Sequence, residues 1–319
     1  MKNYFHKPKL IVSKCLGFDH CRYDGQIISN EFIKELEKHA NIIPICPAVE
    51  IGLEVPRSPI RLVKENNRNS LIQPATGKNI TARMETFSLD FLRNKAVDGF
   101  ILKNRSPSCA INDCKLYDKN NPNPIGKTSG HFARIAQEKF PDVLFEDEGR
   151  LTNFTIRDHF LTGIYTKAEF RKIKKEINMS DLVDFQSKYK YLLMAINEQE
   201  MRKLGRIVAN TENESIEKIF NKYEKHLNSA LNSIAKYTSN INVLMHAFGY
   251  FSNNLNKDEK SFFLDILEKY KDNKVPLSVP KNILKSWIIK YDEEYLAQQQ
   301  FFTPYPEELI DIKDSGAGR

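Results

Sequence analysis

Short apolar runs alternate with amphipathic segments over the first half of the chain. The pattern predicts strands at 9–17, 41–52, 98–104 and 142–148, and helices at 29–39, 84–97 and 130–141. Alternation of strands and helices is typical of a doubly wound sheet with helices on both faces. The first half is therefore predicted to be a Rossmann-like α/β domain with a mostly parallel sheet.

Two longer stretches interrupt this alternation, at 52–79 and 110–130. Both are rich in proline, glycine, asparagine and charged residues, and both exceed the usual length of a connection inside a compact domain. They are predicted to be functional or mobile loops.

Helical periodicity takes over after about residue 150. One apolar stripe recurs every three or four residues through Leu182, Phe185, Tyr189, Leu192, Ile196 and Leu204. Cations lie between these positions and form either a solvated face or a phosphate-binding one: Lys188, Lys190, Arg202, Lys203 and Arg206. The chain is thus divided into an α/β domain at 1–150 and an all-α domain at 151–319.

Composition narrows the choice of partners and compartment. The 319 residues contain 48 Lys and Arg against 41 Asp and Glu, a formal charge of +7 that favours polyanionic partners without requiring one. No apolar run is long enough to cross a membrane or to act as a signal peptide, so a cytoplasmic protein is predicted. Five cysteines, an odd number, favour metal binding or catalysis over a disulfide framework; burial as small hydrophobic residues is the alternative.

Three cysteines share a position at the carboxyl end of a predicted strand: Cys15, Cys46 and Cys109. That edge of an open α/β sheet is where ligands bind, so three thiols distant in sequence are expected to meet there. Three thiolates suit a soft metal or an iron–sulfur cluster with one open position. Cys21 and Cys114 end no strand and are interpreted as spare thiols.

Polar residues follow the same three strand ends. Cations among them can lower the pKa of the thiols, and hydroxyls can donate hydrogen bonds to sulfur or to a substrate. The alternative is that these residues only stabilise the loops that carry them. Asp24 before Gly25 is also a turn signal, and Ser106 before Pro107 is also an ordinary strand end. The set comprises Arg22, Asp24, Glu50, Arg57, Lys103, Arg105, Ser106 and Ser108.

Three ordered motifs in the first half resemble the thiouracil desulfurase family: VSKCLGFDHCRYDG, CPAVEIGLEVPRSPIRLV and KNRSPSC. The segments LVDFQSKYKYLLMA, LGRIVAN and WIIKYDEEYLAQQQFFTPYPEEL resemble the helical domain often fused behind it. The resemblance covers nearly the whole chain. In the helical part, Gln186 stands where a histidine is common, which leaves the role of that position open.

The resemblance implies a [4Fe–4S] cluster held by Cys15, Cys46 and Cys109, with one iron not ligated by protein. It implies a non-redox desulfuration in which that iron takes the sulfur of a thio-base and water replaces it on the carbon. In two-domain members the implied substrate is 4-thiouridine in tRNA, converted to uridine with release of sulfide. Ser106 is then expected to hydrogen-bond the substrate or its sulfur, and Arg22, Asp24 and Lys103 to bind substrate.

One position departs from the family pattern. A glutamate is expected two residues after the second cysteine, to handle protons for the attacking water, and this chain has Ala48 there. Three interpretations are open: Glu50 substitutes for it, the protein is a weak or inactive natural variant, or the chain was engineered to stall turnover. The third is favoured slightly because the surrounding residues keep the pattern.

Two other functions remain as alternatives. One is desulfuration of free thiouracil bases rather than tRNA. The other is an RNA-binding module whose metal site is structural. Neither a membrane nor DNA is an expected partner.

Overall fold

The computed structural model describes residues 5–65, 68–119 and 121–311, and it divides into two compact units. The first unit contains the chain up to Ala168 together with the segment from Pro306 onward, and the second spans Glu169–Tyr305. The predicted domains 1–150 and 151–319 include residues 1–4 and 312–319, which lie outside the described ranges.

A four-stranded parallel sheet forms the centre of the first unit. Its strands are β1 (Lys9–Ser13), β2 (Asn41–Ile45), β6 (Gly99–Leu102) and β9 (Leu144–Asp147), in the order β2-β1-β6-β9. All three strand pairs are parallel. Every residue of β6 is buried, as its unbroken apolar run requires in a sheet covered on both faces. The predicted α/β architecture with a parallel sheet is confirmed.

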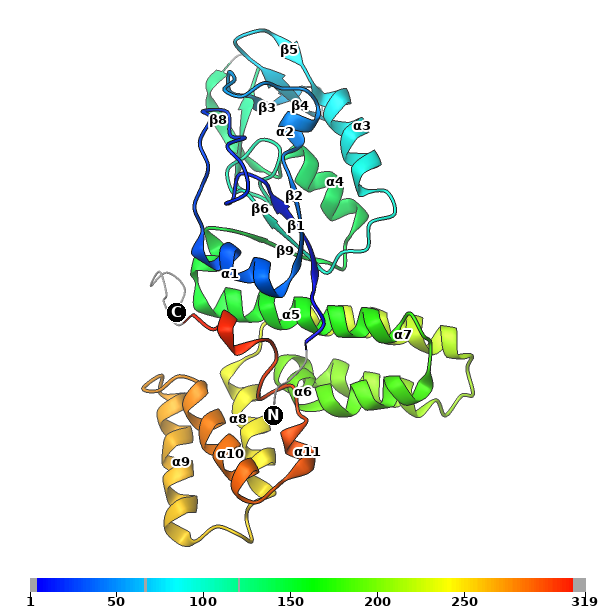
Figure 1. Cartoon of the computed structure of the whole chain (residues 1–319), viewed down its shortest axis with the longest axis vertical. Coiled ribbons are helices and arrows are strands. Elements are labelled where there is room, and N and C mark those ends of the chain that lie inside the picture. The colour runs from blue at the N-terminus through cyan, green and yellow to red at the C-terminus, as the bar shows by residue number, and fades with distance from the viewer. Residues whose placement is uncertain (1–4, 66–67, 120, 312–319) are drawn as a thin grey trace. The chain divides into compact units, whose positions relative to one another are not determined.

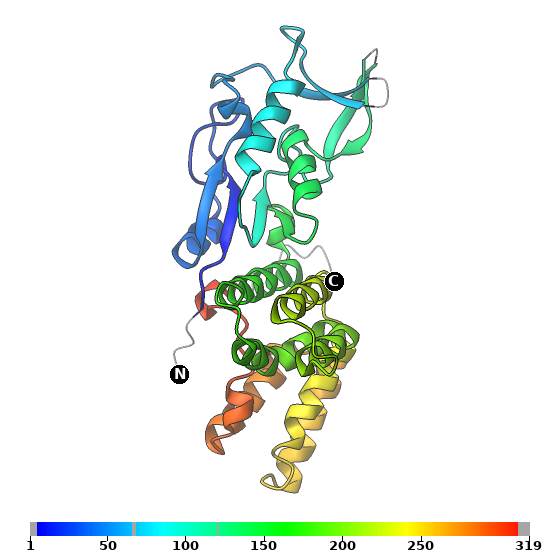
Figure 2. The ribbon, with the colours of Figure 1, turned by 90° about the vertical axis from the view of Figure 1, so that its right-hand side faces the viewer.

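Helices cover both faces of this sheet (Figures 1 and 2). The helices α3 (Thr81–Leu92) and α4 (His131–Lys139) share a core with Ile11 and Phe100. The helices α1 (Glu31–His39) and α5 (Phe154–Ile173) are joined by the Tyr165 hydroxyl, which donates to the His39 carbonyl at 2.9 Å. Asn30 caps α1 by accepting from the Ile33 amide at 3.0 Å.

The two long stretches predicted to be loops fold into a second sheet, so that prediction is wrong. The five strands β3 (Arg61–Glu65), β4 (Arg68–Gln73), β5 (Lys78–Asn79), β7 (Cys114–Asp118) and β8 (Asn121–Thr128) have the order β5-β4-β3-β7-β8. Leu62 and Leu71 pair across β3 and β4 and are buried, whereas β8 is exposed along almost its whole length. An edge strand of that kind tolerates the prolines that favoured a loop.

The predicted strand at 41–52 is also shorter than expected. It ends at Ile45, and residues Pro47–Glu50 form the short helix α2. Proline at the first helical position has its φ already set for a helix and lacks an amide that would be unpaired there. Glu50 therefore follows Cys46 on a helix rather than along a strand.

The second unit is helical, as predicted. Its helices are α6 (Met179–Ala209), α7 (Ile216–Leu231), α8 (Tyr237–Gly249), α9 (Lys257–Lys271), α10 (Ser278–Lys290) and α11 (Glu294–Ala297). All six residues of the predicted apolar stripe in α6 are buried. Asn197 leaves the helical conformation inside α6, and its side chain accepts from the Glu200 amide at 3.1 Å, which restarts the helix.

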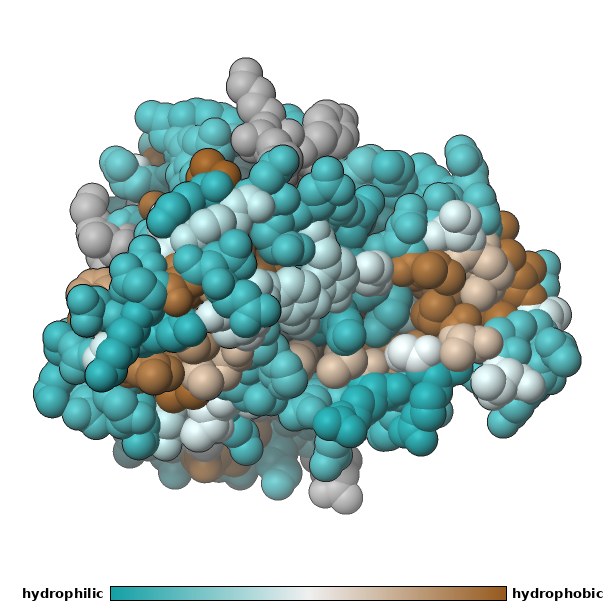
Figure 3. All heavy atoms as spheres, turned by 90° about the horizontal axis from the view of Figure 1, so that it is seen from below, coloured by the Kyte–Doolittle hydropathy of each residue, from teal (hydrophilic) through white to brown (hydrophobic). Residues whose placement is uncertain are grey.

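The surface seen from below is mostly hydrophilic and carries several separate hydrophobic patches (Figure 3). The exposed large apolar side chains of the second unit are Ile177, Val183, Ile234, Tyr237, Met245, Tyr250, Phe262, Leu264 and Ile289.

The division between the units differs from the predicted boundary at residue 150. The 3-10 helix η1 (Arg150–Thr152) and α5 up to Ala168 belong to the first unit, and so does the 3-10 helix η2 (Glu307–Leu309). A Cβ on Gly99 would meet Ile164 at 2.8 Å, and one on Gly163 would meet Leu144 at 2.2 Å, so two glycines let α5 lie directly on the parallel sheet. Periodicity identifies a helix but not the core against which it packs.

Among the described residues, no helix combines the length and the apolar character needed to cross a membrane.

Candidate active site at the edge of the parallel sheet

Cys15 and Cys46 lie just beyond the carboxyl ends of neighbouring strands, β1 and β2. The Lys14 amide donates to the Ile45 carbonyl at 2.8 Å, so the first residue after β1 is tied to the last residue of β2. Cys15 is 8% exposed. Cys46 occupies the N-cap position of α2, where its carbonyl accepts from the Val49 and Glu50 amides at 3.0 and 3.1 Å.

Cys21, which the sequence marked as spare, lies between these two thiols. Hydrogen bonding with Cys15, the largest effect, raises the pKa of Cys21 to about 11, and a hydrogen bond with Cys46 opposes this. The Cys46 thiol also donates to the Cys21 carbonyl, with 3.7 Å between sulfur and oxygen. Cys21 is 2% exposed. The loop after β1 therefore contributes two buried thiols to the edge of the sheet.

The third predicted ligand, Cys109, ends the turn after β6. Ser106 holds this turn: its hydroxyl oxygen accepts from the Ser108 and Cys109 amides at 3.3 and 3.2 Å. Burial raises the pKa of Cys109 to about 12, while hydrogen bonds with Ser13 and Ser106 lower it and the charges of Cys46 and Cys21 raise it. Its hydrogen bond with Ser13, the last residue of β1, brings Cys109 to the strand end that Cys15 follows.

The start of α4 fixes the position of Cys109. The Gly130 amide donates to the Ala110 carbonyl at 2.7 Å, and the His131 amide to the Pro107 carbonyl at 2.8 Å. A Cβ on Gly130 would meet the Ser108 carbonyl carbon at 2.5 Å and the Cys109 nitrogen at 2.7 Å. Only glycine allows this close approach. The imidazole of His131 is buried, its Nε2 has no hydrogen-bond partner among the described residues, and burial lowers its pKa.

We refer to Cys15, Cys21, Cys46 and Cys109 as the cysteine cluster. Hydrogen bonding with Cys21, followed by burial, raises the pKa of Cys46, and the charge of Arg57 lowers it. Arg57 also donates to the Cys21 carbonyl at 3.2 Å. Cys114 begins β7, and its thiol donates to the Lys115 carbonyl at 3.5 Å, so its hydrogen bond is local. All five cysteines are free thiols.

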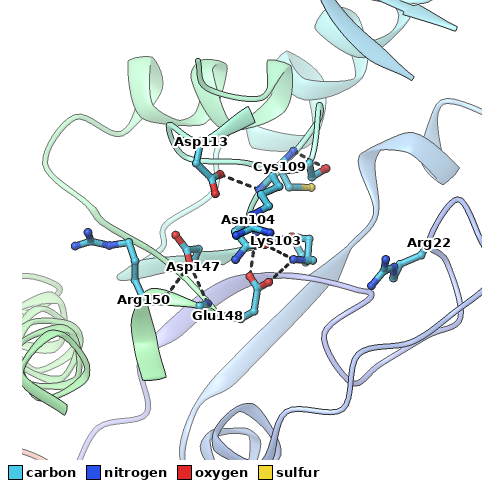
Figure 4. Close-up of polar contacts among 12 residues, drawn as sticks. Arg22, Lys103, Asn104, Cys109, Asp113, Asp147, Glu148 and Arg150 are labelled. Atoms are coloured by element: carbon cyan, nitrogen blue, oxygen red, sulfur yellow. Dashed lines mark hydrogen bonds and ion pairs between the residues drawn. The ribbon is translucent and has the colours of Figure 1, made fainter. Parts of the chain in front are cut away.

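A polar network adjoins Cys109 at the ends of β6 and β9 (Figure 4). The carboxylate of Glu148 forms an ion pair with Lys103 and accepts from the Asn104 amide at 3.0 Å. The Lys103 amide donates to the Ser13 hydroxyl at 2.9 Å, which links this network to β1. Lys103 is therefore held by a counter-charge.

The sequence did not single out Glu148 or Ser13. Glu148 directly follows β9 and Ser13 ends β1, so the strand-end argument that selected the cysteines applies equally to both. No comparable signal identifies the close contact at Gly130.

Arg22 and Asp24 form an ion pair of 3.3 Å on the loop after β1. Asp24 also accepts from the Gln26 amide at 3.1 Å, which is the turn role considered from the sequence. Figure 4 draws Arg22 on this loop, apart from the hydrogen-bonded group around Lys103. Their binding of substrate stays a prediction.

Ala48 and Glu50 lie on α2, just after Cys46. Ala48 is buried and Glu50 is exposed. Glu50 follows Cys46 by four residues, one helical turn, and its charge acts on Lys14, the residue before Cys15. The structure thus keeps Glu50 near the cysteine cluster although the strand on which it was expected does not continue.

No group of three or more His, Cys, Asp or Glu side chains in the described ranges is arranged to hold one metal ion. A [4Fe–4S] cluster imposes a different requirement, because each iron takes its own thiolate. The ligand roles of Cys15, Cys46 and Cys109 therefore stay predictions.

Comparison with known proteins identifies the family of the first unit. Residues 10–148 match the family model described as 2-thiouracil desulfurase, and residues 190–306 match a protein family of unknown function, DUF1722. The chain is 31% identical over 108 residues to the uncharacterized protein YbbK of Bacillus subtilis, covering 72% of that protein and 31% of this chain. The first unit belongs to the 2-thiouracil desulfurase family.

The chain is also similar to a second bacterial protein and to one solved structure. The uncharacterized protein YbgA of Escherichia coli is 27% identical over 161 residues, which are 95% of that protein and 50% of this chain. A solved structure of a [4Fe-4S]-dependent thiouracil desulfidase, TudS, is 23% identical with a TM-score of 0.36, covering 93% of that chain and 46% of this one. Family membership makes this protein an enzyme that cleaves a carbon–sulfur bond, with a thiouracil-type substrate.

Proposed function

We propose that this protein removes the sulfur of 4-thiouridine in tRNA, leaving uridine and sulfide, with a [4Fe–4S] cluster bound by Cys15, Cys46 and Cys109. The observation that carries the proposal is the cysteine cluster itself. Four thiols from three separate segments, three of them buried and Cys46 partly exposed, lie at the sheet edge where α/β enzymes bind ligands. In a family of desulfurases, that is where the chemistry is expected.

The residues present fit such a cofactor by the chemistry of their donors. The raised pKa values of Cys109 and Cys46 mean that both are neutral thiols when no metal is bound, so binding must release their protons. Ser13 and Ser106 hydrogen-bond Cys109, and Arg57 brings positive charge near Cys46, which favours thiolates. Bound there with one iron free of protein ligands, the cluster would supply a Lewis acid that prefers sulfur.

The chain's own groups would orient the base and move protons. The Ser106 hydroxyl oxygen already accepts hydrogen bonds from two backbone amides. Its proton is therefore available for donation to Cys109 or to the sulfur of the substrate. Lys103, fixed by Glu148, would present an ammonium group to the uracil ring, and Arg22 with Asp24 would contact the substrate from the loop after β1.

Proton transfer from the attacking water is the step for which this chain lacks the family's glutamate. The methyl group of Ala48 cannot carry a proton. Glu50 is the carboxylate that α2 offers near Cys46, and it substitutes for the missing glutamate if the chain is active. If Glu50 does not substitute, the chain is a weak variant, natural or engineered.

The tRNA substrate rests on the resemblance and on the basic balance of the chain, because phosphate contacts supply most non-specific affinity for RNA. A cytoplasmic location is part of the proposal, since a reducing compartment keeps all five cysteines as free thiols. Free thiouracil as substrate and a structural metal site in an RNA-binding module are the competing possibilities.

The test is an iron and acid-labile sulfide analysis of anaerobically prepared protein, with Cys15→Ala, Cys46→Ala and Cys109→Ala beside the control Cys114→Ala. Near-equal iron and sulfide, lost in the first three variants and kept in the control, are expected. Sulfide release from free 4-thiouracil and from thiolated tRNA then separates the two substrates. An iron-free protein that folds normally would overturn the proposal.

A further inference from the structure

Three cations lie in one row across the second sheet, on strands β3, β7 and β8. Lys115 pairs directly with Lys127. Leu62 pairs with Leu116 in the parallel ladder, so Arg61, one residue earlier, lies beside Lys115. We refer to Arg61, Lys115 and Lys127 as the basic row.

The basic row faces solvent. Successive residues of a strand point to opposite faces, and the neighbouring Leu62 is buried on the inner face, with 1% exposure. Arg61, Lys115 and Lys127 are all exposed. Tyr117 lies on the same outer face, and the Arg61 guanidinium stacks over its ring at 4.6 Å from the centroid. Stacking holds the guanidinium plane in place and leaves its N–H groups free to donate.

The charge on this row is not balanced by the part of the chain that the structure describes. Among the described residues, no carboxylate forms an ion pair with any of the three cations. The far end of the same face differs: Glu65 pairs across β3 and β4 with Arg68 and contacts Lys119 at 3.5 Å. Like charges directly opposite each other in a sheet are destabilising. A polyanion bound across the row would remove that cost.

The basic row is also close along the chain to the cysteine cluster. The next pair in the ladder is Cys114 with Thr128. Cys114 follows Cys109 by five residues, and Thr128 precedes Gly130, which packs directly on the Cys109 backbone. The two strands that carry Lys115 and Lys127 therefore extend outward from the segment that holds Cys109.

We propose that the basic row, with Tyr117, binds the phosphate backbone of the RNA whose thiolated base reaches the cysteine cluster. This inference rests on the proposed function and adds the surface that holds the RNA. Contacts to phosphate fix the position of a nucleic acid without reading its sequence, which suits an enzyme that recognises one modified base. Rigid strands keep the cations at fixed spacing.

The test compares two triple variants with the same change of charge. One is Arg61→Gln, Lys115→Gln and Lys127→Gln; the control is Lys64→Gln, Arg68→Gln and Lys78→Gln, three exposed cations elsewhere in the same sheet. Binding of tRNA transcripts without sulfur is measured by filter binding over a range of salt concentrations. Circular dichroism, thermal melting and iron content confirm that both variants fold.

We expect the basic-row variant to bind tRNA roughly tenfold or more weakly, with the slope of log affinity against log salt reduced by about two to three. The control is expected to bind within about twofold of the wild type. Equal binding by the basic-row variant and the wild type would overturn the surface while leaving the desulfuration chemistry intact.

If the wild type binds no tRNA, both the surface and the tRNA substrate fail, whereas sulfide release from free 4-thiouracil would still identify the chemistry. A wild type that contains no iron but still binds tRNA would overturn the proposed cofactor and support the basic row. The two proposals therefore fail by different measurements.

Discussion

Ala48 is 4% exposed on α2 and lies where the family resemblance expects a proton-carrying carboxylate. We expect Ala48→Glu to raise the rate of sulfide release by ~10²–10⁴-fold, the usual contribution of a positioned acid or base. The rate is measured by sulfide release from 4-thiouracil with iron-loaded protein, after thermal melting has shown that the larger side chain is accommodated.

Ala48→Gln is the matched control, because glutamine has the size of glutamate but does not titrate. It is expected to stay at the wild-type rate. Equal acceleration by both substitutions would exclude a proton role at this position. A wild type that is already fast, and is inactivated by Glu50→Gln, would identify Glu50 as the substitute.

The ion pair between Lys103 and Glu148 is largely sheltered, with side-chain exposures of 20% and 11%. Glu148→Gln leaves the Lys103 ammonium without its counter-charge, so we expect the free energy of unfolding to fall by about 2 kcal/mol in urea titrations. Adding Lys103→Met should recover part of this loss, because no unpaired charge then remains. A double variant whose loss equals the sum of the two single losses would show that the pair is not coupled.

At the scale of elements, the sequence predicted the parallel sheet well and the second sheet not at all. Strands such as β6 are buried on both faces and are therefore apolar throughout, a pattern that is read directly. β8 has the sequence NPNPIGKT and is exposed at nearly every residue, so nothing in its composition separates an edge strand from a loop. β8 is a strand only because the folded chain pairs it with β7, and that pairing has no local sequence signal.

The same contrast applies to the site. Convergence of Cys15, Cys46 and Cys109 was predictable because the carboxyl ends of parallel strands share one edge. The place of Cys21 depends on how the loop after β1 folds back, where the Ile28 amide donates to the Cys15 carbonyl at 2.8 Å. Sequence spacing carries no information about such a loop.

Substitution of Gly130 tests whether the start of α4 fixes the turn that ends at Cys109. We expect Gly130→Ala to lower the free energy of unfolding by about 1–3 kcal/mol, because the new Cβ collides with backbone atoms that cannot rotate away. Displacement of Cys109 should also lower the iron content of the purified protein. Gly126→Ala is the control, since a Cβ there meets nothing within 4 Å. Normal iron content in Gly130→Ala would show that the turn adapts without moving the thiol.

His131, the first residue of α4, makes stability depend on pH. Burial and the charge of Arg134 lower its pKa from the ordinary value of 6.5, against opposing effects of Glu85 and Glu138. The unfolded chain therefore takes up this proton first as the pH falls, and stability is lost from about 6.5 downward. We expect the free energy of unfolding of the wild type to fall more steeply between pH 7 and 5 than that of His131→Gln. Parallel curves would mean that the imidazole is not protected from protonation in the fold.

For the whole molecule, the chain leaves the first unit within α5, after Ala168, and returns to it at Pro306. The returning segment packs η2 against α1, and Arg157 of α5 donates to the Asp311 carbonyl. A protein cut after the second unit would therefore lose part of the first unit's core, although all its cysteines would remain. The two units cannot be separated by a single cut without this loss.

Substitution of Leu309 tests how much the returning segment contributes to the stability of the first unit. Leu309 is 2% exposed, whereas its neighbour Ile310 is 50% exposed. We expect Leu309→Ala to lower the free energy of unfolding by about 2–4 kcal/mol, from lost burial and the cavity left behind. Ile310→Ala, on the same segment, should change it by less than about 0.5 kcal/mol. Hydrogen exchange locates the effect: faster exchange in α1 with unchanged exchange in α9 is expected if the segment stabilises the first unit. Faster exchange in α9 with α1 unaffected would mean that the last residues stabilise the second unit instead.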